Sequence, residues 1–364
     1  MAYRNCAPLD SGTDLASSPP DGTNADQEGK GTRNMGNIRI LLTGGGGAAA
    51  ISFMDALAGD PAEIFVADID PHAAGLYLVP ASRRLLIPRG DDPTFAETML
   101  ALCRRNGITL LVPTVDCELL PLARAESEFM RHGTRVVVAP EAALGLCLDK
   151  WKLLTACRGH IAIPRTALLD QTFSPADWEL PVVVKPRSAS GSRGVRVIEE
   201  WRELETASME GDLIIQEYLP GEEHSVDVLV DPATGLAVAA VPRSRLKVDS
   251  GIAVAGRTVH DAGLAESARK VVELVGMRFV ANVQFRQDRH GRHTLLEVNP
   301  RFPGTMTLTV ASGINMPRLA IDAALGATLA GRSYPFTDLA MVRTWQDHYF
   351  SPDELLSKAE ESVA

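Results

Sequence analysis

Two segments about a hundred residues apart constrain this chain more than any other feature. Residues 181–186 (PVVVKP) form an apolar, β-branched run that carries Lys185 at its end, and a loop of small residues, 188–195, follows. Residues 294–301 (TLLEVNPR) place a carboxylate, a carboxamide and a guanidinium at the end of another strand. Backbone amides of such a loop suit phosphate, and oxygen ligands suit Mg²⁺. Together the two segments predict binding of ATP and transfer of its terminal phosphate.

The loop after Lys185 is a weak signal when it is taken alone. Loops of glycine and serine are commonly plain exposed loops, and no GxxxxGK[ST] motif occurs in the chain. The plain-loop alternative therefore stays open for residues 188–195.

A second motif spans residues 213–227 (LIIQEYLPGEEHSVD). An apolar strand ends in Glu217, the chain turns at Pro220 and Gly221, and an alternating strand restarts near Glu223. Such a strand-to-strand hinge offers backbone groups to an adenine edge and a carboxylate to the ribose hydroxyls. A simple hairpin with solvated acids is the alternative.

The third motif supplies ligands for a metal ion. Strands expected at 279–286 and 293–298 are joined by a short polar turn, which lets Gln284 and Glu297 converge. Glu297 and Asn299 are two residues apart and share one face of their strand. Mg²⁺ binds through few protein oxygens plus substrate phosphates, and Arg301 is placed to neutralise a transferred phosphoryl group.

The amino-terminal part shows the alternation of a parallel, doubly wound sheet. Strands are expected at 37–42, 64–68, 108–113 and 135–139, and helices at 48–57, 93–106 and 116–132. Residues 44–49 (GGGGAA) also match a G-x-G-x-x-A dinucleotide fingerprint with Asp68 downstream, so an NAD-dependent oxidoreductase is an outside alternative. Beyond the third motif, helices are expected at 315–330 and 352–361.

Composition excludes several classes of function. The 364 residues carry a net charge of -10, so a basic face for nucleic acid is not expected. No apolar run is long enough for a bilayer, so no membrane partner is expected. Residues 1–35 are polar and are predicted to be a disordered extension. Five cysteines without a CxxC pair predict reduced thiols in a cytoplasmic protein.

As an ordered set, these motifs resemble the ATP-grasp superfamily, and within it the branch of carbamoyl-phosphate synthase large-chain domains, biotin carboxylases and amino-acid ligases. The resemblance implies an α/β, Rossmann-like pre-ATP-grasp domain at 36–140. A mixed α+β ATP-grasp region would follow, with a small lobe at 141–225 that carries the phosphate loop and a large lobe at 226–364 that carries the metal site and the carboxy-terminal helices.

The resemblance also implies a role for each matching residue. ATP would be bound by lysines, the small-residue loop and the hinge, namely Lys150, Lys185, Ser188, Ser190, Gly191, Ser192, Gly194, Glu217, Tyr218, Leu219 and Glu223. Mg²⁺ (or Mn²⁺) would be held by Gln284, Glu297 and Asn299, while Arg301 and Lys185 would act in catalysis. Gln284 departs from the commoner Asp or Glu, which leaves the metal site one negative charge short and puts tight binding of a second ion in question.

Substrate contacts are expected from two regions. In the amino-terminal domain they are Gly46 in the glycine loop, and Asp116 and Glu118 after a strand end. For the segment 114–118, capping of a helix by Thr114 or Asp116 is the alternative. In the basic stretch 242–257 they are Arg243, Arg245 and Arg257, each of which is equally well an ordinary surface arginine.

The implied activity is that of a carboxylate–amine ligase that acts on amino acids or small carboxylates through an acyl phosphate and releases ADP and phosphate. A carboxylase or carbamoyl-transferring enzyme that acts through carboxyphosphate, and a nucleotide-binding module without catalysis, are the alternatives. Relatives are often dimers, so a homodimer is considered beside a monomer.

Overall fold

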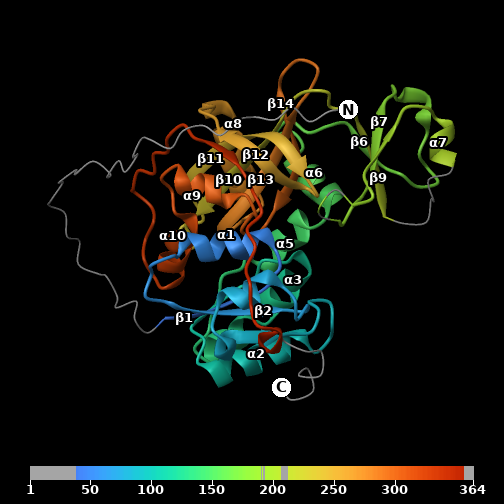
Figure 1. Cartoon of the computed structure of the whole chain (residues 1–364). Coiled ribbons are helices and arrows are strands. Elements are labelled where there is room, and N and C mark those ends of the chain that lie inside the picture. Colours follow the sequence, from blue (N-terminus) through green and yellow to red (C-terminus); the bar gives the residue numbers. More distant parts are fainter. Residues whose placement is uncertain (1–37, 190, 192, 206–211, 356–364) are drawn as a thin grey trace, which may run out of the picture. The chain divides into compact units, whose positions relative to one another are not determined.

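Residues 38–189, 191, 193–205 and 212–355 are described by a computed structural model of the chain (Figure 1). The first sheet has five parallel strands in the order β3-β2-β1-β4-β5, which confirms the predicted doubly wound topology. Its strands are β1 (Arg39–Leu42), β2 (Glu63–Asp68), β3 (Arg84–Leu86), β4 (Leu110–Val112) and β5 (Arg135–Val136). The apolar residues of β1 are fully buried because helices cover both faces of such a sheet.

The helices of this part are α1 (Ala48–Ala56), α2 (Phe95–Asn106), α3 (Asp116–Arg124) and α4 (Glu126–Arg131), with 3-10 turns η2 (Ala74–Leu78) and η3 (Ala81–Arg83). The single helix expected over 116–132 is wrong. The chain leaves helical geometry at Ala125, where ψ is 0°, and α4 starts afresh. The strand expected over 135–139 is also shorter, because only its first two residues pair with β4.

The second sheet is antiparallel and has four strands in the order β6-β9-β7-β8. They are β6 (Thr166–Leu168), β7 (Val182–Pro186), β8 (Arg196–Ile198) and β9 (Leu213–Glu217), with α7 (Arg202–Glu205) and η4 (Pro175–Asp177) beside them. Val182 and Val184 are buried in a small hydrophobic cluster of this lobe's own. The prediction that residues 182–185 form a buried strand that delivers Lys185 is confirmed.

The third sheet has six antiparallel strands in the order β14-β13-β10-β11-β12-β15. They are β10 (Glu223–Val230), β11 (Ala237–Asp249), β12 (Ile252–Thr258), β13 (Phe279–Gln287), β14 (His293–Asn299) and β15 (Ala340–Val342). The helices around it are α8 (Ala262–Leu274), α9 (Met306–Ala311), α10 (Met316–Ala324) and the short turn η5 (Pro352–Glu354). The expected boundary at 225–226 falls inside β10, and the division into domains stays a proposal.

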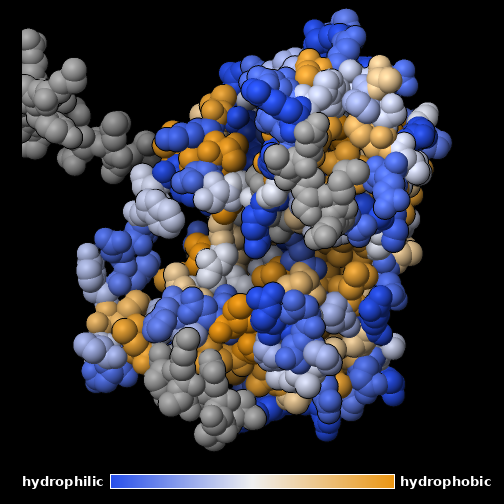
Figure 2. Space-filling view, turned by 90° about the vertical axis from the view of Figure 1, so that its right-hand side faces the viewer, coloured by the Kyte–Doolittle hydropathy of each residue, from blue (hydrophilic) through white to orange (hydrophobic). Residues whose placement is uncertain are grey.

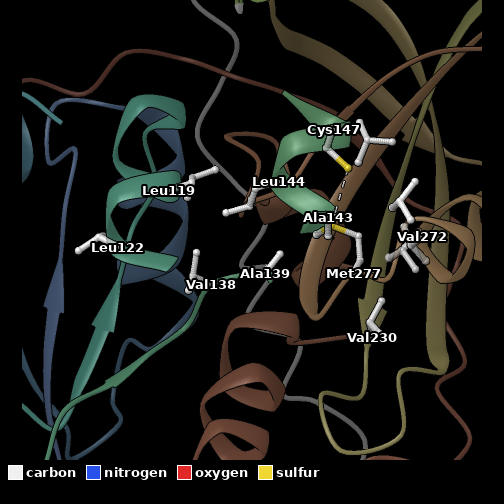
Figure 3. Packing of buried hydrophobic residues seen from close by; sticks show 14 of the residues in the cluster. Leu119, Leu122, Val138, Ala139, Ala143, Leu144, Cys147, Val230, Val272 and Met277 are labelled. Carbon is white, nitrogen blue, oxygen red and sulfur yellow. Dashed lines mark hydrogen bonds between the residues drawn. The ribbon is translucent and has the colours of Figure 1, made fainter. Parts of the chain in front are cut away.

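Hydrophobic packing joins the first and third sheets. One buried cluster runs from Leu119 of α3 through Leu144 of α5 (Glu141–Cys147) to Val230 of β10 and Val272 of α8, as Figure 3 shows. The next helix, α6 (Lys150–Cys157), is anchored to the same cluster through Leu153 and Leu154. This continuous core fixes the start of α6, where Lys150 lies, against β14.

Two expectations at the carboxy-terminal end differ from the structure. The helix expected over 315–330 ends at Ala324, because Gly326 takes the left-handed conformation with φ 98°. Of the helix expected at 352–361, η5 is present, and residues 356–361 lie outside the described part. Residues 1–35 lie outside it as well.

The face drawn in Figure 2 is mostly hydrophilic in its upper part, and hydrophobic side chains are more frequent in the lower half. Among the helices that the structure describes, none combines the length and apolar character needed to cross a membrane.

Candidate active site

A cavity of about 530 Å³ is lined by residues from all three sheets. The predicted residues that line it come from α6, β7, the loop 188–195, β9 and the hinge after it, β10, β11, β13, β14 and the segment after β14, namely Lys150, Lys185, Gly191, Glu217, Tyr218, Leu219, Glu223, Arg245, Gln284, Glu297, Asn299 and Arg301. Residues widely separated in the chain are therefore brought to one place.

Two lysines line the cavity together with Glu297. Lys185 ends a buried strand and is 7% exposed, and burial lowers its pKa to about 8 although the charge of Glu297 opposes this shift. Lys150 begins α6, and its Nζ lies 3.2 Å from Glu297 Oε2 and donates to the Ala189 carbonyl at 2.6 Å. Two ammonium groups and one carboxylate make this end of the cavity strongly polar.

The position of Lys150 follows from its helix cap. Asp149 is the N-cap of α6 and accepts hydrogen bonds from the backbone N–H groups of Trp151 and Lys152. The same carboxylate lies 2.6 Å from Arg187 Nη2, and Lys150 N donates to the Arg187 carbonyl at 3.0 Å. The start of α6 is thereby tied to the exit of β7, which keeps Lys150 next to Lys185.

The predicted metal ligands lie opposite one another on paired strands. Gln284 pairs with Glu297 across β13 and β14, and Asn299 pairs with Asn282. No cluster of three or more His, Cys, Asp or Glu suited to a metal ion occurs among the residues described. The set of one carboxylate and two carboxamides nevertheless fits Mg²⁺, which takes few protein oxygens and completes its shell with phosphates and water.

The hinge joins two sheets and is not a hairpin. β9 pairs with β6 and β7, whereas β10 pairs with β11 and β13. Between them Gly221 N donates to the Gln287 carbonyl at 3.0 Å. A Cβ on Gly221 would lie 2.6 Å from Gln287 Cβ, so this close approach needs glycine. Tyr218 and Leu219 face the cavity at this crossing.

Arg301 is paired with Asp116, the first residue of α3. Its Nε lies 2.6 Å from Asp116 Oδ1 and its Nη2 lies 3.4 Å from Oδ2, a two-point pairing of guanidinium and carboxylate. Asp116 itself does not line the cavity. Asp116 contacts Arg301, which does line the cavity.

Several predicted contact residues do not line the cavity: Gly46, Ser188, Gly194, Asp116, Glu118, Arg243 and Arg257. The expectation that Arg243 lies in a substrate pocket is wrong, because its guanidinium is buried, pairs with Asp227 at 2.5 Å and donates to the Thr305 carbonyl at 2.9 Å. Arg257 is exposed on β12. Ser190 and Ser192 lie outside the described residues.

Glu118 is also turned away from the cavity. It is 3% exposed and accepts a short hydrogen bond from the Thr43 hydroxyl, and burial raises its pKa to about 7. The capping alternative for this segment is wrong as well. The N-cap of α3 is Val115, without a side-chain cap, and the Thr114 hydroxyl donates to the Thr43 carbonyl.

Arg286 and Asp68 also line the cavity, although neither was predicted to contact ATP, a metal ion or substrate and Asp68 appeared only in the dinucleotide fingerprint. Arg286 lies two residues after Gln284 on β13 and so shares its face, a relation that strand alternation alone predicts. Asp68 at the end of β2 accepts from Gly46 N at 2.8 Å and reaches the cavity, while Gly46 remains behind it.

Known proteins resemble the chain in sequence pattern and in fold. Residues 40–137 match the family model of PylC-like amino-terminal domains, and residues 209–346 match that of the ATP-grasp in the biosynthetic pathway with Ter operon.

Solved structures of three enzymes share the fold at low identity. Biotin carboxylase from Campylobacter jejuni is 17% identical with a TM-score of 0.65, and the match covers 81% of this chain and 73% of that one. L-amino acid ligase from Bacillus licheniformis is 16% identical with a TM-score of 0.62, and the match covers 80% of this chain and 74% of that one. N5-carboxyaminoimidazole synthetase from Staphylococcus aureus, complexed with ADP, is 13% identical with a TM-score of 0.66, and the match covers 82% of this chain and 80% of that one. With a parallel amino-terminal sheet and an ATP-grasp fold behind it, the chain matches the ATP-grasp superfamily in fold, and residues 209–346 match it in sequence pattern as well.

Proposed function

We propose that this protein is an ATP-dependent carboxylate–amine ligase that activates an amino acid or small carboxylate as an acyl phosphate and releases ADP and phosphate. The observation that carries the proposal is a single cavity lined by Lys150 in contact with Glu297, by the buried Lys185 and by Arg301. Catalysis of phosphoryl transfer requires mainly positioning and charge neutralisation, and this cavity offers both.

In this proposal the nucleotide lies between the second and third sheets. The hinge with Glu217, Tyr218 and Leu219 receives adenine, and Glu223 receives the ribose. Lys150, Lys185 and the loop that contains Gly191 hold the phosphates, whose charge the two ammonium groups neutralise.

The metal and the acceptor lie at the other end of the cavity. Glu297, Asn299 and Gln284 would hold Mg²⁺, which withdraws charge from the phosphate oxygens when bound. Arg301 stabilises the carboxylate and phosphate charges that meet there, and Asp116 orients its guanidinium. The amine then displaces phosphate from the activated carboxylate, so no covalent enzyme nucleophile is required.

A carboxyphosphate reaction is the second candidate. Two of the solved structures described above are named as a biotin carboxylase and an N5-carboxyaminoimidazole synthetase, and their TM-scores exceed that of the amino-acid ligase. Bicarbonate as the activated carboxylate would use the same cavity, so the two candidates differ in acceptor and not in nucleotide chemistry.

Release of ADP, AMP and phosphate from Mg·ATP, measured with amino-acid pools and separately with bicarbonate, tests the proposal. We expect ADP and phosphate release that depends on an amino-acid pool. Glu297→Gln should reduce it by about a hundredfold or more, since several kcal/mol of charge stabilisation at the metal are lost. Arg257→Gln, on an exposed arginine outside the cavity, is the control and should turn over normally.

Release that depends on bicarbonate alone would favour the second candidate. AMP and pyrophosphate as products would refute the acyl-phosphate step. Binding of ATP without turnover on any pool would favour a nucleotide-binding module.

A further inference from the structure

Arg245 is a buried cation inside the cavity, and acceptors fix it from three sides. Its side chain is 7% exposed. Nη1 pairs with Glu223 and donates to Gln284 Oε1 at 3.1 Å, and Nη2 donates to the Gly251 carbonyl at 2.7 Å. Buried charges are retained where they are paired and hydrogen-bonded, so this guanidinium is a permanent part of the site.

Sheet register places Arg245 between the expected ribose and metal ends. Ser244 of β11 pairs with His224 of β10, so the next residue along β11 lies beside Glu223. Gln284 of β13 pairs with Ser225 of β10, two residues further along the same face. A side chain as long as arginine spans these two rows and reaches both acceptors.

The amide of Gln284 is oriented by this contact. Its oxygen faces Arg245, and its nitrogen donates to Asn282 Oδ1 at 3.4 Å. A Mg²⁺ ion bound about 2.1 Å from that oxygen would lie within about 5 Å of the guanidinium nitrogen, with no carboxylate at position 284 to offset the repulsion. Glu297 already faces two ammonium groups.

We propose that Arg245 takes the place of a second divalent cation and occupies the Gln284 oxygen. The chain then holds one metal ion with its nucleotide, at Glu297 and Asn299, which narrows the three ligands given under the proposed function to two. The proposal rests on nucleotide binding as given under the proposed function. The positive charge that a second ion would bring is built into β11 as Arg245, and its neighbour at position 284 is a neutral carboxamide.

Metal stoichiometry tests this directly. The full chain is saturated with β,γ-imido-ATP and titrated with Mn²⁺, and free Mn²⁺ is read by electron paramagnetic resonance. We expect one Mn²⁺ per bound nucleotide for the unaltered protein and for the control Arg257→Gln. Arg245→Gln combined with Gln284→Glu should bind two, the second at least about tenfold more tightly than any second ion on the unaltered protein, since one repulsive charge is removed and one attractive charge is added.

Gln284→Glu alone should still bind one ion, because the new carboxylate pairs with Arg245. Should the double variant melt at the assay temperature, Arg245→Gln alone is titrated, and a measurable second site is expected there too. Two ions on the unaltered protein, or one ion on every variant, would overturn the role of Arg245 while nucleotide binding stands. Failure of the unaltered protein to bind the nucleotide would overturn the proposed function and this inference with it.

Discussion

Glu118 is the carboxyl group whose burial has the clearest consequence for stability. It lies in the first turn of α3, is 3% exposed and accepts from the Thr43 hydroxyl. Burial raises its pKa from 4.5 to about 7, and the charges of Asp68 and Asp116 add to the shift. The folded protein therefore keeps a proton on Glu118 at a pH where the unfolded chain has released it.

The sign and size of the effect follow from this difference. Between pH 4.5 and about 7 the folded state binds one proton more than the unfolded state, so stability falls as pH rises. Each pH unit is worth about 1.4 kcal/mol, which gives a loss of about 3 kcal/mol across the interval, constant above it. Glu118→Gln has similar shape and no charge, so the variant should gain about 3 kcal/mol relative to the unaltered protein between pH 4.5 and pH 8.

Urea unfolding of both proteins at several pH values measures this gain. Glu97→Gln, on an exposed residue of α2, is the matched control and should follow the unaltered protein throughout. A carbon-13 titration should show one carboxyl midpoint near 7 that is absent in Glu118→Gln. Parallel stability profiles for the two proteins, or a Glu118 midpoint near 4.5, would refute the reasoning. Because Glu118 does not line the cavity, ATP affinity should be unchanged.

Two further substitutions test contacts seen only in the folded chain. Arg243→Met should destabilise the protein by about 3–5 kcal/mol in thermal or urea unfolding, because Asp227 is left as a buried, unpaired charge; a change below 1 kcal/mol would contradict a structural role. Asp116→Asn should lower kcat by about ten- to hundredfold with little change in the KM for ATP, because Arg301 loses its orientation. A selective rise in KM for ATP would instead place Asp116 in nucleotide binding.

Much of the fold follows from local sequence patterns. The alternation of strands and helices predicted the parallel sheet of β1 to β5, and the β-branched run predicted the buried strand that carries Lys185. Boundaries were less certain, as the break at Ala125 and the early end of α10 show, because cap geometry depends on single residues and their packing.

Local sequence patterns likewise predicted only part of the candidate site. The two-residue period of a strand put Glu297 and Asn299 on one face, and the short β13–β14 turn brought Gln284 opposite Glu297. The pairing of Arg301 with Asp116, 185 residues apart, had no counterpart in any local pattern. It depends on how the first and third sheets share one core.

By itself, the sequence determined the order of the motifs, the direction of side chains along each strand and the resemblance to the ATP-grasp superfamily, because these rest on periodicity and on residue types close together in the chain. Arg243 and Arg245 show what only tertiary structure decided. They are two residues apart on β11 and share a face of the strand. Arg243 is nevertheless buried and donates to the carbonyl of Thr305, which precedes α9. Arg245 instead lines the cavity, where it contacts Glu223 and Gln284. This difference is set by the segment around Thr305, about sixty residues further along the chain, which packs over Arg243. The strand pattern predicts which face a side chain lies on, but the burial of that face depends on what packs against it.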